Sequence, residues 1–178
     1  MRKCLVVIDM QNDFITGSLG TKEAQAIVPK VVEKVKRYDA ERTNYSNIFF
    51  TQDTHRTDYL TTQEGRMLPV RHCITDTEGW KIHKDLQDYC GDITNIYMKE
   101  TFGCDILARH LSFIVKEDDE IEVVGLVSDI CVISNALLFK TFNPEVNIIV
   151  DSSCCAGTTP EMHEQAMNVM RSCQIIVK

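Results

Sequence analysis

Short runs of apolar, largely β-branched residues alternate along the chain with longer segments in which apolar and polar residues recur at helical spacing. The short runs predict strands at residues 4–8, 47–51, 95–98, 120–126, 146–150 and 174–177. The longer segments predict helices at residues 22–38, 105–111, 130–142 and 160–171. This alternation is typical of an α/β fold, in which helices cover a mainly parallel sheet.

The segment of residues 53–94 fits neither pattern, because glycines and a proline interrupt a largely polar sequence. An irregular stretch of this length inside a compact domain is usually functional. The sequence contains no internal repeat, low-complexity tract or linker that would divide it. We therefore expect one domain over residues 1–178, with a functional segment at about 53–94.

Titratable residues follow three of the predicted strands. Asp9 ends the first strand, Lys99 ends the third, and Cys131 lies at a small-residue turn after the fourth, where a helix begins. The carboxyl ends of parallel strands meet at one edge of a sheet, so these side chains could share a cleft. Amides that open a helix favour a thiolate, and a nearby carboxylate can accept the thiol proton. The set predicts a cysteine nucleophile. In the alternative, Asp9 caps a turn, Lys99 is solvated and Cys131 packs in the core.

Carboxylates and imidazoles gather in the irregular segment. Asp53 and His55 are two residues apart, so their side chains project to the same side of an extended chain, and Glu64 and His72 follow. This set of oxygen and nitrogen donors suits zinc, iron or manganese. We expect a divalent metal, with zinc as the first choice. The alternative is that these side chains face solvent, as loop carboxylates and histidines usually do.

Charge and composition narrow the range of partners. The formal net charge is −7, and no block of Lys and Arg could follow a phosphate backbone, which argues against nucleic acid. Asp9 interrupts the N-terminal apolar run, and no apolar stretch reaches membrane-spanning length. We expect a cytoplasmic protein that does not bind membranes. In that compartment the eight cysteines, including the adjacent Cys154 and Cys155, are expected to be free thiols.

Three motifs occur together and in order: Val-Ile-Asp-Met-Gln-Asn-Asp-Phe at residues 7–14, Lys99 after a strand, and Gly-Leu-Val-Ser-Asp-Ile-Cys-Val at residues 125–132. With them, nearly the whole chain resembles the isochorismatase-like cysteine hydrolases, the superfamily that contains nicotinamidase/pyrazinamidase. The resemblance implies a three-layer α/β/α sandwich with a mainly parallel, Rossmann-like sheet. It also implies that Asp9, Lys99 and Cys131 form a catalytic triad.

The same resemblance implies the surroundings of the cysteine. The peptide bond between Val127 and Ser128 should be cis, and the backbone amides of Val127 and Cys131 should form an oxyanion hole. Phe14 should line the substrate pocket, and Phe102 would fill an aromatic position in it.

The predicted metal donors point to one branch of the superfamily. Nicotinamidase-like members hold a metal beside the catalytic cysteine, whereas isochorismatase and N-carbamoylsarcosine amidase are not expected to carry these ligands. The residues that match the nicotinamidase pattern are Asp53, His55, Glu64 and His72. The resemblance thus implies metal-dependent hydrolysis of nicotinamide, or a related small carboxamide, to the acid and ammonia through a thioester.

The substrate remains open in two respects. Many nicotinamidases have an aromatic residue just before the second metal histidine, but residues 68–71 contain none. Tyr59 or Trp80 could replace this wall of the pocket, and Arg71 could instead favour an acidic substrate. Two alternatives to a nicotinamidase are a hydrolase of another small amide or carbamoyl compound and a non-enzymatic binding or assembly protein. Members of the superfamily often form dimers or tetramers, so we expect a homo-oligomer.

Overall fold

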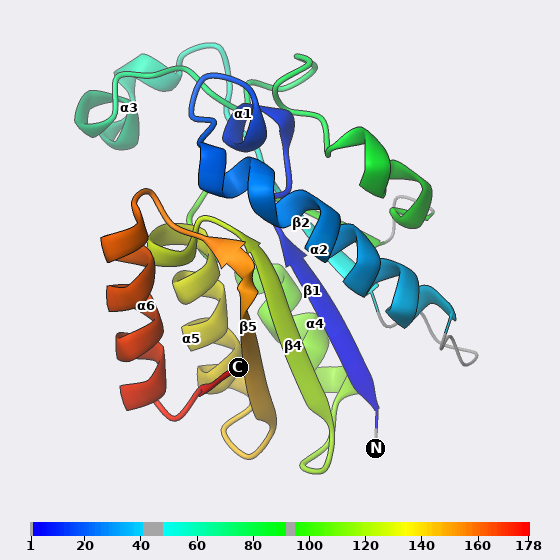
Figure 1. The fold of residues 1–178 in the computed structure, drawn as a ribbon. Coiled ribbons are helices and arrows are strands. Elements are labelled where there is room, and N and C mark those ends of the chain that lie inside the picture. Colours follow the sequence, from blue (N-terminus) through cyan, green and yellow to red (C-terminus); the bar gives the residue numbers. More distant parts are fainter. Residues whose placement is uncertain (1, 41–47, 92–94) are drawn as a thin grey trace.

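The computed structural model describes residues 2–40, 48–91 and 95–178. Within them, six strands form one parallel sheet in the order β3-β2-β1-β4-β5-β6, and helices cover both of its faces (Figure 1). The strands are β1 (Lys3–Ile8), β2 (Ile48–Asp53), β3 (Ile96–Lys99), β4 (Glu120–Leu126), β5 (Asn147–Ala156) and β6 (Ile176–Val177). The predicted three-layer α/β/α architecture is confirmed.

The two faces of the sheet bury alternate residues of the same strands. Leu5 and Val7 pack beneath one layer of helices, and Val6 and Ile8 pack beneath the other. The first layer contains α1 (Asn12–Ile15), α2 (Lys22–Ala40) and the 3₁₀ helix η2 (Lys84–Tyr89). The second contains α4 (Asp105–Ile114), α5 (Ile133–Phe142) and α6 (Pro160–Ser172). Burial on both faces explains why the strands are continuous apolar runs rather than alternating ones.

Several element boundaries differ from the prediction, among them those of β5, β6 and α5. β5 continues beyond residue 150 to Ala156. The pairing with β4 shifts its register after Val150 and begins again at Cys155, so the polar residues between them form an irregularity within the strand. β6 is shorter than predicted, since the chain turns at Gln174, whose φ is +64°. The predicted helix of residues 130–142 begins as a π-helical turn at Ser128–Val132 and becomes α5 only at Ile133. Residue 47 of a predicted strand and residues 92–94 of the predicted irregular segment lie outside the described residues.

Gly125 allows β4 to approach β1 closely just before the turn that carries Cys131. Its φ is +120°, and a Cβ atom at this position would lie 2.1 Å from the carbonyl oxygen of Ile8. Only glycine fits this combination of backbone angle and space. The close approach places the end of β1, and hence Asp9, beside the end of β4.

The irregular segment after β2 crosses the carboxyl end of the sheet with little regular structure. It contains the 3₁₀ turn η1 (Tyr59–Thr61) and the short helix α3 (Gln63–Met67), followed by η2. An isolated bridge from Gln11 to Ile82 attaches it to the rest of the fold, and one from His55 to Ile74 joins two parts of the segment itself. The segment therefore forms one wall of the region where the strands end.

All eight cysteines are free thiols, and Cys173 alone among them is exposed. The adjacent Cys154 and Cys155 are both buried in β5. No helix in the described part of the chain has the length and apolar character needed to cross a membrane.

Candidate active site

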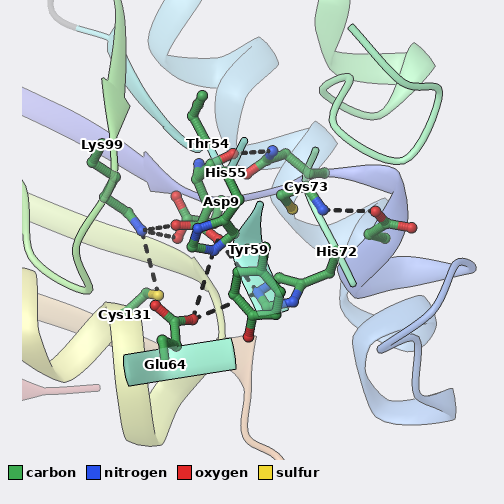
Figure 2. Close-up of polar contacts among 12 residues, drawn as sticks. Asp9, Thr54, His55, Tyr59, Glu64, His72, Cys73, Lys99 and Cys131 are labelled. Carbon is green, nitrogen blue, oxygen red and sulfur yellow. Dashed lines mark hydrogen bonds and ion pairs between the residues drawn. The ribbon is translucent and has the colours of Figure 1, made fainter. Parts of the chain in front are cut away.

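Asp9, Lys99 and Cys131 meet at the carboxyl end of the sheet, although they are far apart in the sequence (Figure 2). The Nζ atom of Lys99 lies 2.7 Å from Oδ2 of Asp9 and 3.5 Å from Sγ of Cys131. All three residues are buried. The structure therefore brings together a carboxylate, an ammonium group and a thiol, as general-base activation of a nucleophile requires.

Asp9 is held in an unusual backbone conformation. Its φ is +45°, in the left-handed region that residues other than glycine seldom adopt. Thr51 stabilises this conformation, because its Oγ1 accepts a hydrogen bond from the Asp9 amide at 3.1 Å and donates one to Asp9 Oδ1 at 2.6 Å. Within the described residues, Oδ2 makes an ion pair with Lys99 but has no well-aligned hydrogen-bond partner. That oxygen is available to accept a proton.

The charges of the three residues depend on one another. Burial opposes the charge on Lys99, but the negative charges of Asp9 and Asp53 help to outweigh it, and the lysine pKa is raised well above its usual value. Burial raises the pKa of Asp9, and Lys99 only partly offsets this. Burial and the charge of Asp9 also raise the pKa of the Cys131 thiol well above its usual value. Burial and Asp9 thus oppose the thiolate that the start of the helix was expected to favour, and Asp9 lies where it could take the thiol proton during the attack.

The turn between β4 and α5 contains a cis peptide, but at a different bond from the expected one. The cis bond joins Leu126 to Val127, so the expected position between Val127 and Ser128 is wrong by one residue. β4 ends at Leu126, and the chain changes direction there. Neither Val127 nor Ser128 is proline, so the local sequence contains no signal that shows which peptide bond is cis. Ser128 is fully buried, and Val127 and Cys131 both face the neighbouring cavity.

The donor atoms of Asp53 at the end of β2 and of His55 and His72 in the following segment lie within 4.8 Å of one another. Glu64 points toward the two histidines (Figure 2). Oδ2 of Asp53 lies 3.0 Å from Nε2 of His55 and 3.6 Å from Nε2 of His72. Oε1 of Glu64 lies 3.6 Å and 3.8 Å from the same two nitrogens. The structure thus brings together all four predicted metal donors, next to the Asp9, Lys99 and Cys131 cluster.

The hydrogen bonds of these donors fit a bound cation. Nε2 of His55 is buried and has no aligned hydrogen-bond partner within the described residues. Nδ1 of His72 bonds to the Val70 carbonyl at 2.9 Å, which leaves Nε2 to face the other donors. Lys99 engages Oδ1 of Asp53 at 3.1 Å, so Oδ2 is the oxygen that faces the two histidines. Burial opposes ionisation of Asp53, but bonding to His55 and the charge of Lys99 lower its pKa, so it is an anionic donor.

Two residues of the first motif support the metal donors, a role that sequence reasoning did not assign. The side-chain amide of Gln11 accepts a hydrogen bond from the Asp53 amide at 2.7 Å and donates to the Asp53 carbonyl at 2.9 Å. Oδ2 of Asp13 accepts a bond from the amide of Cys73, next to His72, at 2.8 Å. Their place in the motif at residues 7–14 is the signal that could have identified them.

A cavity of about 780 Å³ opens in front of Cys131. Phe14 and Phe102 line it, as do Met67, Leu68 and the metal donors Asp53, Glu64 and His72. Tyr59, Trp80 and Arg71 do not line it. The Tyr59 ring packs against His55 and His72, with centroids 4.6 Å and 5.0 Å away, and Trp80 Nε1 donates to Thr54 Oγ1. The suggestions that Tyr59 or Trp80 replaces the missing wall, or that Arg71 selects the substrate, are not supported by this geometry.

Comparison with known proteins agrees with the fold. The chain is 23% identical to a nicotinamidase of Saccharomyces cerevisiae, over 98% of each chain. It is 26% identical to the pyrazinamidase of Pyrococcus horikoshii, whose structure was determined in complex with zinc, with a TM-score of 0.79 and coverage of 100% and 99% of the two chains. The nicotinamidase/pyrazinamidase of Bacillus subtilis gives 25% identity and a TM-score of 0.81, with 99% of both chains covered.

The family relationship extends across the described structure. The model of the isochorismatase domain matches residues 3–178, which include both the cysteine cluster and the metal donors. The similarity to nicotinamidases and pyrazinamidases supports an amidohydrolase, and the zinc-bound relative together with the donor geometry supports a divalent metal. This chain belongs to the isochorismatase family of hydrolases.

Proposed function

We propose that this protein is a metal-dependent cysteine amidohydrolase that converts nicotinamide, or a related small carboxamide, to the acid and ammonia. The main support for the proposal is that Cys131 and the metal donors Asp53, Glu64 and His72 line the same cavity. A substrate in this cavity could contact the nucleophile and the metal position at once.

Cys131 would act as the nucleophile and Asp9 as the general base. As sulfur bonds to the amide carbon, Asp9 takes the thiol proton, and the backbone amides of Val127 and Cys131 stabilise the negative oxygen. Asp9 then returns the proton to the departing nitrogen, so ammonia leaves and a thioester remains. Water adds to the thioester carbon as Asp9 accepts its proton. The carbon–sulfur bond then breaks, and Asp9 gives this proton to the sulfur, which restores the thiol and the Asp9 carboxylate and releases the acid. Lys99 keeps the Asp9 carboxylate in place.

Asp53, His55, Glu64 and His72 would hold the divalent cation, and their mixed donor set makes zinc the first choice over iron or manganese. When bound, the ion would supply a Lewis acid that accepts a ring nitrogen of the substrate or polarises water. Phe14, which packs beside His72 with ring centroids 5.6 Å apart, would contact the flat face of an aromatic substrate.

The charges around the cavity favour a neutral substrate over an anionic one. Its charged lining residues within the described chain are Asp53, Glu64 and Glu100, all acidic. The proposed divalent cation would offset the charges of Asp53 and Glu64. A substrate carboxylate would still find no lysine or arginine among those lining residues, and Glu100 would remain as a like charge. We therefore prefer an uncharged carboxamide to the acidic substrate that Arg71 would have served.

The test is ammonia release from nicotinamide by the purified protein, with the bound metal quantified. Cys131→Ala should abolish activity and retain the metal, and His55→Ala should lose both. Cys173→Ala is the matched control, because it removes an exposed thiol outside the cavity and should preserve both. Metal binding without nicotinamide hydrolysis would shift the assignment to another small amide or carbamoyl substrate. Inactivity of the metal-loaded protein on a panel of such compounds would favour a binding protein.

A further inference from the structure

His163 connects α6 to the turn that carries Cys131. Its Nδ1 lies 2.7 Å from Oγ of Ser128, and its Nε2 lies 3.0 Å from Oγ of Ser152 in β5. Burial lowers the pKa of His163, so the imidazole is neutral near pH 7 and has one donor and one acceptor nitrogen. Each nitrogen is thus matched to one serine hydroxyl.

Other contacts hold the start of α6 against the same turn. Asp129 accepts hydrogen bonds from the amide and the hydroxyl of Thr158, at 2.8 Å and 2.6 Å. A Cβ atom on Gly157 would lie 2.8 Å from the amide nitrogen of His163 and 2.9 Å from Oδ1 of Asp129, so this approach requires glycine. Thr158 itself lines the cavity in front of Cys131. The segment of residues 157–163 is therefore packed directly against the nucleophile's turn.

We propose that His163 is a positioning residue for the hydrolysis, acting through its Nδ1 contact with Ser128. Ser128 follows Val127, whose amide is one of the two assigned to the oxyanion hole, and precedes Cys131, which supplies the other. The hydrogen bond to Ser128 fixes the backbone between these two amides. This inference depends on the proposed function, because it concerns the geometry of the same oxyanion hole.

The size of the effect follows from the precision that oxyanion stabilisation needs. Loss of one oxyanion donor typically costs about a hundredfold to a thousandfold in kcat, and a misplacement of about 1 Å can cost roughly a hundredfold. Loss of the His163 contact displaces these donors without removing them. We expect kcat to fall about tenfold to a hundredfold in His163→Ala, with KM and bound metal within about threefold of the parent protein.

Two further variants separate the nitrogen atoms of His163. In His163→Asn the side-chain amide occupies the place of Nδ1 and can still bond to Ser128, whereas in His163→Gln it reaches the place of Nε2 and bonds to Ser152. Both keep one donor and one acceptor. The proposal requires His163→Asn to retain kcat within about threefold and His163→Gln to behave like His163→Ala.

A substrate-independent measurement accompanies the kinetics: amide hydrogen exchange over residues 126–132. Exchange should accelerate in His163→Ala and His163→Gln but not in His163→Asn. His110→Ala is the matched control, because this histidine contacts Tyr97 and Phe49 on the opposite side of α5, and it should change neither kcat nor exchange in the turn.

The possible outcomes distinguish the two proposals. The positioning role would be overturned if the parent protein is active and all His163 variants keep its kcat and its rate of amide exchange in the turn. Equal losses of kcat in His163→Asn and His163→Ala would also overturn it. A metal-loaded parent without amidase activity would overturn the proposed function. In that case the exchange pattern alone decides whether His163 holds the turn, and unchanged exchange would refute it.

Discussion

The ammonium group of Lys99 lies 2.7 Å from the carboxylate of Asp9, and both side chains are almost completely shielded from solvent. Lys99 also contacts Asp53, so one buried cation pairs with a carboxylate of the cysteine cluster and with a carboxylate of the metal cluster. The proposed catalytic and metal sites consequently share a common electrostatic centre.

Lys99→Met should impair both stability and catalysis. Removing one partner of a buried ion pair typically costs about 3–5 kcal/mol of unfolding free energy, because the remaining charge has no compensation. Without the lysine, the pKa of Asp9 should rise further, and a protonated Asp9 cannot act as a base. We expect kcat to fall by at least about a hundredfold. Urea unfolding and steady-state kinetics test this, and a variant as stable and active as the parent would contradict the role of Lys99.

Gln11→Ala should weaken metal binding although Gln11 is not a proposed ligand. Its amide makes two hydrogen bonds to the backbone of Asp53, and residues that orient ligands typically contribute about tenfold to a hundredfold in metal affinity. Competition with a chelator measures this change directly. Asn12→Ala is the control, since Asn12 bonds to Glu78 at the surface and should leave the affinity unchanged. Equal affinities of the two variants would contradict the prediction.

Glu122→Gln should alter the pH dependence of stability. Burial opposes the charges of Glu122 and Asp151, but hydrogen bonding to Lys34 outweighs it and lowers both pKa values from 4.5 and 3.8. The unfolded chain binds these protons more tightly, so their stabilisation is fully present above about pH 4.5 and is lost as the pH falls through the folded-state values.

At pH 7, Glu122→Gln should therefore lose about 1–3 kcal/mol of unfolding free energy, because a hydrogen bond to a charged partner is removed. The difference from the parent should shrink as the pH approaches 3. Urea titrations at a series of pH values provide the measurement, with the exposed Glu145→Gln as the control. If the difference in unfolding free energy between Glu122→Gln and the parent does not depend on pH, the charge of Glu122 is not its source.

Phe102→Ala should weaken substrate binding with little effect on the fold. Phe102 lines the cavity and is already 47% exposed, so its truncation removes few core contacts. We expect KM for an aromatic amide to rise roughly tenfold, from the loss of apolar contact with the ring. Phe113→Ala, at a site that is 87% exposed and outside the cavity lining, should leave KM unchanged. Matching KM values in the two variants would remove Phe102 from the substrate pocket.

The fold and the two clusters of side chains were accessible from the sequence because they depend on repeated or local patterns. The apolar runs predicted the parallel strands, and the strand ends located Asp9, Lys99 and Cys131. Asp53 and His55 followed from their spacing, and Glu64 and His72 completed the donor set; the resemblance to a known family strengthened the assignment of all four. Asp9, Asp53 and Lys99 lie at the ends of the neighbouring parallel strands β1, β2 and β3, so the sheet itself brings them together.

Features that depend on three-dimensional packing were not predicted. The pKa of Cys131 is governed by burial beside Asp9, which outweighs the effect expected from the helix start. Tyr59 and Trp80 were candidates for the cavity wall, but hydrogen bonds to Leu68 and Thr54 direct them elsewhere. His163 had no recognisable partner in the sequence, because Ser128 and Ser152 approach it only after α6 has packed against the sheet.

The solvent exposure of Cys173 makes the protein suitable for labelling at one site. The other seven thiols are buried, and Cys131 opens only into the cavity, so a bulky maleimide should attach to Cys173. This residue caps the C-terminal end of α6, about 20 Å along the helix from the end that packs against the nucleophile's turn. A fluorophore there would report movements of α6 without occupying the site that those movements would affect.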